Sequence, residues 1–245
     1  CSPEIPNITG IYPMRFRLSN YLLIVFVVCL ARFYHPLAAD EVRHSGRNSY
    51  QVVTGEDPEE ERARWDTIYK RGGYVYGKEP TAYLVAHADL LPRGGRSLVL
   101  AMGEGQNAVY LARRGFQSEG IDFSEVALKK AKRLAKESGV AITTVNADLT
   151  HYTLKAGAYD VIVNNDFLLR ALIPQIKRAL KSGGVVIYRN QSIEQLKNIG
   201  GAGLPKDELL EKGELKALFS DFEILHYEET NNGKEAWASL VARKR

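Results

Sequence analysis

Short apolar runs alternate with amphipathic stretches over most of the chain after residue 95. The apolar runs have the length of buried strands, and the stretches between them repeat apolar residues at helical spacing. We expect strands at 97–101, 116–122, 141–146, 159–164 and 185–189, with helices at 107–114, 124–138 and 168–180. This alternation predicts an α/β fold with a doubly wound, Rossmann-like sheet and helices on both faces.

The last part of the chain departs from the alternation. Two strand-like runs, 222–228 and 236–242, flank Asn231-Asn-Gly-Lys234, which is a β-hairpin signal. We therefore expect a seven-stranded sheet that ends in an antiparallel hairpin. Because there is no internal repeat, residues 57–245 are predicted to form a single domain.

Two helices are expected before the first strand, over 57–92. The run Asp57-Pro58-Glu-Glu-Glu61 is typical of a helix start, since it combines a cap, a first-turn proline and acids at the positive end of the helix dipole. Gly72-Gly73 ends this helix. A loop with Tyr74 and Tyr76 then leads into a second helix that runs to Leu90.

Residues 1–39 have the pattern of a secretory signal peptide. A start at Met14 is followed by arginines, by the apolar run 21–31 and by the small-residue exit Leu37-Ala38-Ala39. The run is short for a membrane span of ~20 residues. We expect cleavage after Ala39, a flexible lead-in over 40–56 and export to the periplasm or the medium. A membrane anchor formed by an uncleaved segment 21–31 is the alternative.

The leader changes what composition and charge imply. The whole chain has a net charge of +4 and a pI near 8.9, and the leader contributes three arginines and one glutamate to that balance. Both cysteines, Cys1 and Cys29, also lie in it. The remaining chain is nearly neutral and free of thiols, which excludes a cysteine nucleophile and a thiolate metal site. Its nearly neutral charge also gives little support to a basic face that binds nucleic acid. No histidine spacing suggests a metal site.

A glycine loop carries the clearest chemical signal. In Leu98-Val-Leu-Ala-Met-Gly103-Glu-Gly105-Gln-Asn107 a strand runs through two glycines into a helix. Glycines allow close backbone approach to a ligand, and a helix start offers free N–H groups. Asp122 ends the next strand, where a carboxylate can accept both hydroxyls of a ribose. Together these features predict a nucleoside site.

Further short motifs follow the glycine loop in a fixed order. They are Gly120-Ile-Asp122-Phe-Ser124, Asn146-Ala-Asp148, Tyr159-Asp160-Val-Ile-Val and Leu180-Lys-Ser-Gly183-Gly184. In this order, over about 65–243, the sequence resembles the class I S-adenosylmethionine-dependent methyltransferases. More narrowly, it resembles the small bacterial subgroup that includes tellurite-resistance and thiopurine S-methyltransferase-like enzymes. Trp65-x-x-x-Tyr69 and Tyr74-x-Tyr76-Gly77-x-x-Pro80 are similar to the lid of that subgroup, and the resemblance implies that the helices over 57–92 are lid helices.

The resemblance implies S-adenosylmethionine as the cofactor. Gly103 and Gly105 would lie against its methionine and ribose, Asp122 would hold the ribose, and Asn164 would sit beneath the sulfonium. Phe123 would lie along the adenine and Asp148 would accept from its amino group. The remaining cofactor-site candidates are Glu104, Asn107 and Ala147, and the lid and acceptor candidates are Tyr74, Tyr76, Asn165, Arg170 and Arg189.

Three positions depart from the family pattern. Val99 stands where the first strand usually has an acid, Ala101 stands where a glycine is usual, and Met102 stands where relatives often carry Glu. An acid at this end of the strand would hold the ammonium group of the cofactor. Glu104 is the nearest residue that could replace it.

The expected reaction is in-line methyl transfer to a small, soft, anionic acceptor, such as a thiol or a selenium or tellurium oxyanion. Such an acceptor needs no strong base, since positioning and desolvation supply most of the acceleration. Two alternatives stay open. Gly103-x-Gly105-x-x-Ala108 also fits the dinucleotide fingerprint of an NAD(P)-dependent oxidoreductase. The other alternative is an exported, non-catalytic nucleoside-binding protein derived from a methyltransferase.

Overall fold

The computed structural model describes residues 58–245. The predicted leader, its start at Met14, the apolar run 21–31 and the lead-in 40–56 lie outside the described residues. Within residues 58–245, no helix is both long enough and apolar enough to cross a membrane.

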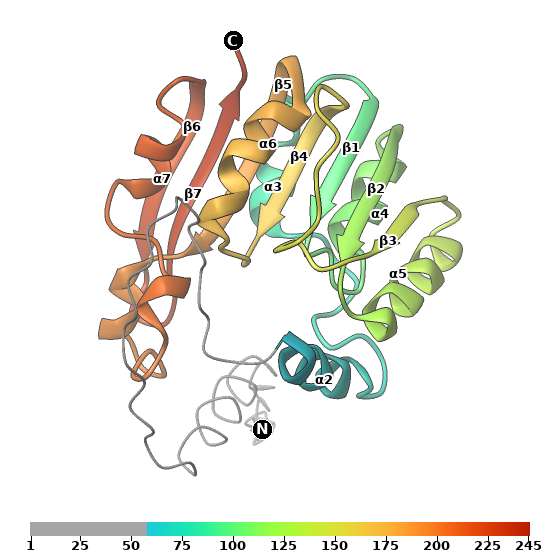
Figure 1. Ribbon diagram of the computed structural model, residues 1–245, viewed down its shortest axis with the longest axis horizontal. Coiled ribbons are helices and arrows are strands. Elements are labelled where there is room, and N and C mark those ends of the chain that lie inside the picture. The colour runs from blue at the N-terminus through green and yellow to red at the C-terminus, as the bar shows by residue number, and fades with distance from the viewer. Residues whose placement is uncertain (1–57) are drawn as a thin grey trace, which may run out of the picture. The chain divides into compact units, whose positions relative to one another are not determined.

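Seven strands form one mixed sheet (Figure 1). They are β1 (Gly95–Leu100), β2 (Phe116–Asp122), β3 (Thr143–Asn146), β4 (Tyr159–Asn165), β5 (Leu180–Gln191), β6 (Glu223–Asn231) and β7 (Ala236–Arg243). Their order across the sheet is β3-β2-β1-β4-β5-β7-β6. The first five run parallel, and β7 pairs antiparallel with both β5 and β6. The predicted fold class, including the terminal hairpin, is confirmed.

Helices cover both faces of the sheet. They are α2 (Pro58–Tyr69), α3 (Ala82–Ala86), α4 (Gln106–Arg113), α5 (Glu125–Glu137), α6 (Ile173–Ala179) and α7 (Glu214–Leu218). On one face α6 and α7 bury Ile176 and Leu215 against the strands. On the other face α3, α4 and α5 bury Leu84, Leu111 and Ala131. Apolar side chains pointing alternately to the two faces of each strand build these two core layers.

Local signals explain where two of the helices begin. The Ser124 hydroxyl accepts the Ala127 N–H at 3.1 Å, which caps α5 as predicted. Gly105 has a φ of 91° and stands just before α4. That conformation is costly for residues with a Cβ, so glycine fits there.

Several element boundaries differ from the prediction. The helix expected over 168–180 is a short 3-10 turn followed by α6, with Pro174 in the first turn of α6. β5 begins at Leu180 rather than at residue 185 as predicted. The added part contains Gly183 and Gly184, and its pairing with β4 is irregular. The second N-terminal helix is only α3 followed by the 3-10 turn Ala88–Leu90. The segment 192–213, with two 3-10 turns, was not predicted.

The carboxyl ends of the parallel strands form the edge that matters for function. Figure 1 shows α2 lying beyond the arrowheads of β1, β2 and β4. The strand order reverses between β1 and β4, since β1 continues to β2 on one side and β4 continues to β5 on the other. Ligands of open α/β sheets bind at such a switch point.

Candidate active site

The loop that follows β1 turns sharply into α4. Three of its residues have left-handed backbone angles, with φ of 44° at Ala101, 54° at Gly103 and 91° at Gly105. A Cβ on Gly105 would lie 2.7 Å from the Cβ of Ala131 on α5, so glycine permits this helix contact. A Cβ on Gly103 would lie 3.0 Å from the Tyr69 hydroxyl. Ala101 adopts the same region without the freedom of glycine, which stores local strain.

Asp122 joins the end of β2 to the glycine loop. One carboxylate oxygen accepts the Gly103 N–H at 2.8 Å, and the other accepts the Ser124 N–H at 2.9 Å. Burial raises the pKa of Asp122, while the N–H groups of Ser124 and Gly103 partly oppose the shift. Each oxygen of an ionised carboxylate has a further lone pair. Asp122 therefore keeps the capacity to accept hydrogen bonds from a diol.

The residues predicted to surround an adenine gather beside Asp122. The Asn146 amide donates to the carbonyls of Asp122 and Phe123, at 3.2 and 2.9 Å. The Ala147 N–H donates to the Asp122 carbonyl at 3.1 Å. Asp148 follows, and although burial raises its pKa, hydrogen bonds from Thr150 and His151 lower it overall. The ends of β2 and β3 thus bring Phe123, Ala147 and Asp148 to one place, with the carboxylate of Asp148 favoured.

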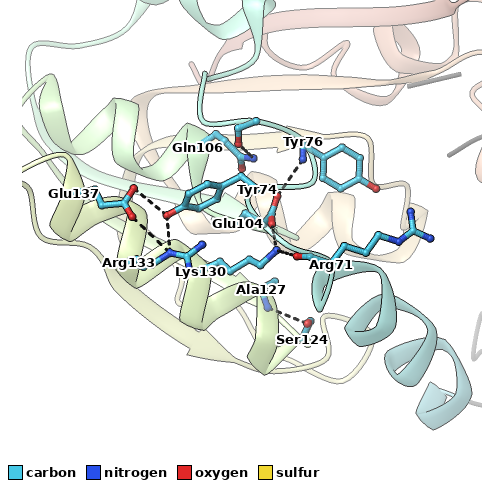
Figure 2. Close-up of polar contacts among 11 residues, drawn as sticks. Arg71, Tyr74, Tyr76, Glu104, Gln106, Ser124, Ala127, Lys130, Arg133 and Glu137 are labelled. Atoms are coloured by element: carbon cyan, nitrogen blue, oxygen red, sulfur yellow. Dashed lines mark hydrogen bonds and ion pairs between the residues drawn. The ribbon is translucent and has the colours of Figure 1, made fainter. Parts of the chain in front are cut away.

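Glu104 lies in the glycine loop but faces the lid, defined here as residues 58–81. Its side chain is 0% exposed, and one carboxylate oxygen lies 2.8 Å from the Lys130 ammonium of α5. The same ammonium donates to the Arg71 carbonyl at 2.9 Å, and the Tyr76 N–H donates to the other Glu104 oxygen at 3.2 Å (Figure 2). The charge of Glu104 is therefore balanced within the protein.

Lys130 is largely buried, unlike its neighbour Lys129 on α5, whose side chain is 76% exposed. The side chain of Lys130 is only 11% exposed because it reaches beneath the lid to Glu104. Its position beside Ala127, Ala131 and Leu134, at helical spacing on the buried side, is the signal that identifies it.

Further contacts hold the lid to the start of α4 and α5. The Gln106 amide donates to the Gly77 carbonyl at 2.9 Å. The Asn107 carbonyl oxygen accepts both the N–H and the hydroxyl of Thr81, each at 2.9 Å. The Ser124 hydroxyl donates to Asp66 of α2. Asn107, predicted to contact the cofactor, is thus an anchor for the lid in this structure.

The two lid tyrosines lie in different surroundings. The Tyr74 hydroxyl accepts from Arg133 Nε at 3.1 Å and donates to Glu137 at 3.3 Å, on the outer side of α5 (Figure 2). The Tyr76 ring meets Tyr69 edge-on, with 6.2 Å between the ring centroids. Burial and the nearby Asp122 raise the pKa of Tyr69 well above its ordinary value. Tyr76 and Tyr69 therefore cover the glycine loop, whereas Tyr74 fastens the lid to α5.

A narrow crevice lies at the ends of β4 and β5. It is lined by Thr81 of the lid, by Tyr83 and Leu84 of α3 and by the strand residues Val163, Asn164, Asn165, Ile187 and Arg189. The Arg189 guanidinium lies 3.6 Å from the centroid of the Trp237 ring. The crevice thus brings together two of the predicted acceptor candidates, Asn165 and Arg189.

Arg170, the third polar acceptor candidate, lies apart from the crevice. Its guanidinium makes two bonds to Glu214, at 2.6 and 2.9 Å, and one to the Leu209 carbonyl at 2.8 Å. These bonds fasten the segment after β5, and they already balance the charge of Arg170.

One polar pair near the crevice was not predicted. The Tyr83 hydroxyl lies 3.0 Å from Nδ1 of His226 on β6, and the His226 ring lies 4.2 Å from that of His87. Burial raises the pKa of Tyr83 above its ordinary value. Tyr83 and His226 are 143 residues apart in the chain, so no local pattern signals the contact. The pair ties α3 to the terminal hairpin.

Comparison with known proteins agrees with this geometry. Residues 98–184, from β1 to the turn within β5, match the family described as "Methyltransferase domain". Among curated proteins, the chain is similar to an uncharacterised methyltransferase, YodH of Bacillus subtilis, with 28% identity over 89 residues, covering 35% of this chain and 38% of YodH. The chain spans less than half the length of the curated relatives it matches.

Solved structures share the fold. TehB from Haemophilus influenzae has a TM-score of 0.56 at 22% identity, covering 66% of this chain and 61% of that one. An S-adenosylmethionine-dependent methyltransferase from Mesorhizobium loti has a TM-score of 0.55 at 20% identity, covering 67% and 98%. These similarities show that the domain shares the Rossmann-like α/β fold of these proteins.

Proposed function

We propose that this protein is an S-adenosylmethionine-dependent methyltransferase that acts on a small molecule by in-line displacement. The observation that carries the proposal is the joining of Asp122 to the Gly103 N–H at the switch point of the sheet. This junction falls within the stretch that matches the methyltransferase domain.

The residues at this edge fit the cofactor. Asp122 has spare lone pairs for the ribose hydroxyls, and Asp148, with a lowered pKa, is an acceptor for the adenine amino group. Asn164 is 0% exposed, and its Oδ1 has no hydrogen-bond partner among the described residues. That oxygen suits the cationic end of the cofactor, in place of Glu104, whose charge Lys130 balances. When bound, S-adenosylmethionine supplies an electrophilic methyl group on a sulfonium.

The protein's part in the reaction is positioning and exclusion of water. The lid, held by Lys130 and Asn107, carries Tyr69 and Tyr76 over the glycine loop. A covered, water-poor site strengthens the attraction between a sulfonium and an electron-rich acceptor. No side chain has to act as a strong base if the acceptor arrives as a good nucleophile.

For the acceptor we propose a small, soft molecule, such as a thiol or a selenium or tellurium oxyanion. The resemblance to the tellurite-resistance and thiopurine S-methyltransferase-like subgroup and the fold shared with TehB support this class. Arg189, at the crevice, supplies positive charge near such an acceptor.

An oxidoreductase is disfavoured by the topology. The usual dinucleotide-binding sheet has the order 3-2-1-4-5-6. Here β7 is inserted antiparallel between β5 and β6. A non-catalytic, exported binding protein remains the second alternative, and turnover distinguishes it from an enzyme.

The experiment is a transfer assay with methyl-labelled S-adenosylmethionine and a panel of thiols, selenite, tellurite and halides. Label in the product together with release of S-adenosylhomocysteine supports an enzyme. Tight cofactor binding with no transfer to any acceptor supports the binding protein.

We also propose that the protein is exported through its N-terminal segment. The test is the N-terminal sequence of the protein recovered from its native host. A sequence starting at Asp40 supports cleavage after Ala39, and one starting at Met14 contradicts it.

A further inference from the structure

The ammonium group of S-adenosylmethionine has no acid to bind in the glycine loop. Val99 and Met102 stand where the family pattern has acids, and both are apolar and buried. Glu104 is 0% exposed as well, and its charge is balanced by Lys130. A cation in a covered site is costly unless an opposite charge pairs with it. The counter-charge is therefore expected from another element at this edge of the sheet.

The end of β4 supplies a carboxylate at this edge. β1 and β4 pair in parallel, with Leu100 opposite Asn164. Two residues beyond this pair come Met102 on one side and Asp166 on the other. The neighbouring strand thus carries an acid at the position that corresponds to the missing one. The Asp166 N–H donates to the Arg189 carbonyl at 2.8 Å, which fixes the backbone of Asp166 against the end of β5.

The backbone of Asp166 is held in a strained conformation. Its φ is 57°, and within residues 58–245 the only other residue besides glycine with a positive φ is Ala101, at the end of β1. Asp and Asn adopt this left-handed region more readily than other residues with a Cβ. Strain of this kind persists where the surrounding structure enforces it, and it gathers at ligand sites. Both strained residues follow the strands that flank the switch point of the sheet.

The Asp166 carboxylate is accessible to a ligand although protein surrounds it. The residue is exposed to solvent. Nearby protein nevertheless raises the pKa of Asp166 through desolvation, and Arg189 and Gln191 partly oppose that shift. Asp166 makes no ion pair with the described part of the chain, so Arg189 acts on it only at longer range. An acid in these surroundings is stabilised when a cation binds beside it.

Two neighbouring groups place this acid on the cofactor side of the sheet edge. Burial is the main cause of the raised pKa of Tyr69, whose hydroxyl covers Gly103, and the charges of Asp122 and Asp166 add to it. Asp166 is therefore close to the part of the glycine loop expected to face the methionine. Asn164, two residues before it, has a buried Oδ1 with no partner within residues 58–245. That neutral oxygen suits the sulfonium, which a short carbon chain separates from the ammonium.

We propose that Asp166 binds the α-ammonium group of S-adenosylmethionine, in place of the acid that the glycine loop lacks. Asp166 is then a cofactor-binding residue supplied by β4, while Asp122 and Asp148 bind the nucleoside. This inference rests on the proposed function and adds an ionic contact to its cofactor site. The same contact holds the ammonium group of S-adenosylhomocysteine, because the two molecules differ only at the sulfur.

The test compares two ligands that differ only in the ammonium group. Isothermal titration calorimetry on the full-length protein measures the affinity for S-adenosylhomocysteine and for its deamino analogue, in which hydrogen replaces the α-amino group. A hydrogen bond between charged groups contributes about 10-fold or more in affinity. We therefore expect the wild-type protein to bind S-adenosylhomocysteine at least about 10-fold more tightly than the analogue.

Asp166→Asn removes the charge and keeps the backbone conformation. Asn tolerates the same left-handed region, so the variant should keep the Tm of the wild-type protein to within about 2 °C. It should bind S-adenosylhomocysteine about 10-fold more weakly, and it should bind the analogue no more weakly than the wild-type protein does. The preference for the ammonium group is then largely lost.

Glu235→Gln is the matched control. Glu235 is an exposed acid whose charge also acts on Asp166. Its replacement changes the local charge by the same amount without removing the proposed contact. This control should keep the preference of the wild-type protein to within about 2-fold.

The outcomes are separable from those of the proposed function. Equal affinity of the wild-type protein for both ligands, an unchanged preference in Asp166→Asn, or the same loss of preference in Glu235→Gln overturns the inference. An equal loss of affinity for both ligands in Asp166→Asn overturns it too, since that result shows a structural role. None of these results affects the proposed methyltransferase, because S-adenosylhomocysteine still binds. Failure of S-adenosylhomocysteine to bind the wild-type protein overturns both the proposed function and the inference built on it.

Discussion

The glycine-loop side of the candidate active site and the crevice at β4 and β5 are built in opposite ways. Around the glycine loop, the carboxylates of Asp122 and Glu104 and the amide of Asn107 are all bonded to backbone or lid groups. At the end of β4, the amide oxygens of Asn164 and Asn165 have no partner within residues 58–245.

The difference indicates that the two regions have separate roles in ligand binding. Groups with partners hold the lid and the loop in one geometry before any ligand arrives, and this lowers the entropic cost of binding. Unpaired acceptors cost stability in the free protein and regain it when a donor binds. In our proposal the first region holds the cofactor, and the second keeps unpaired acceptors available for a ligand.

Among variants of the preorganised region, replacement of Lys130 should have the largest effect on stability. Lys130→Met leaves the buried charge of Glu104 unpaired, which should lower the free energy of unfolding by about 3–5 kcal/mol. Chemical denaturation measures this loss. The control is Lys129→Met, because the Lys129 side chain is 76% exposed and should contribute little.

A second variant tests whether the Lys130 effect is electrostatic. Glu104→Gln combined with Lys130→Met should recover most of the stability, since Gln can still accept the Tyr76 N–H. If the double variant is no more stable than Lys130→Met, the unpaired charge is not the cause.

A variant of Asp122 tests whether the glycine-loop region binds the cofactor. Asp122→Ala removes an acceptor expected to hold two ribose hydroxyls, so affinity for S-adenosylmethionine should fall at least about 100-fold. Isothermal titration calorimetry measures this loss of affinity. Asp89→Ala, at an exposed carboxylate, should bind like the wild-type protein. Unchanged affinity in Asp122→Ala would mean that the ribose lies elsewhere.

The dependence of binding on pH sharpens the role of Asp122. Burial raises its pKa above the ordinary 3.8, so its carboxylate takes up a proton earlier than a typical Asp as the pH falls. Cofactor affinity should therefore decline on acidification, with a midpoint above 3.8. Asp148 has a lowered pKa and stays ionised through that range. Asp122→Asn, measured over the same titration, should remove the decline; if the decline persists, another group causes it.

The smallest expected effect concerns strain in the glycine loop. Ala101 has a φ of 44°, where glycine is the unstrained residue. Ala101→Gly should raise the free energy of unfolding by up to about 1 kcal/mol, or Tm by about 2–4 °C. Ala112→Gly, within α4, should instead lower stability by about 1 kcal/mol. A loss of stability in Ala101→Gly would show that the methyl group packs usefully.

Most of the fold could be predicted because its signals are local. The alternation of strands and helices, the Ser124 cap and the hairpin at Asn231–Lys234 are each encoded within a few residues. The segment 192–213 could not be predicted, because it is held by distant contacts. One of them is the hydrogen bond of Ser192 with Ala236, and another is the fastening of Leu209 by Arg170.

The residues of the candidate site also differ in how far the sequence predicts them. Gly103, Gly105 and Asp122 follow from motif spacing, and the structure brings them together. Helical spacing marks Lys130 as buried but does not identify its partner Glu104. The Tyr83–His226 pair has no sequence signal, because the packing of α3 against β6 alone brings the two residues together. Unpaired atoms such as Asn165 Oδ1 are properties of the folded structure alone.

Calorimetry of the purified protein against S-adenosylmethionine, S-adenosylhomocysteine and NAD(P)H tests the central claim most directly. We predict saturable binding of the first two ligands at one site per chain, and no heat with NAD(P)H. Binding of NAD(P)H in their place, or no heat with either methionine-derived ligand, would contradict the assignment of the glycine loop and Asp122 to S-adenosylmethionine.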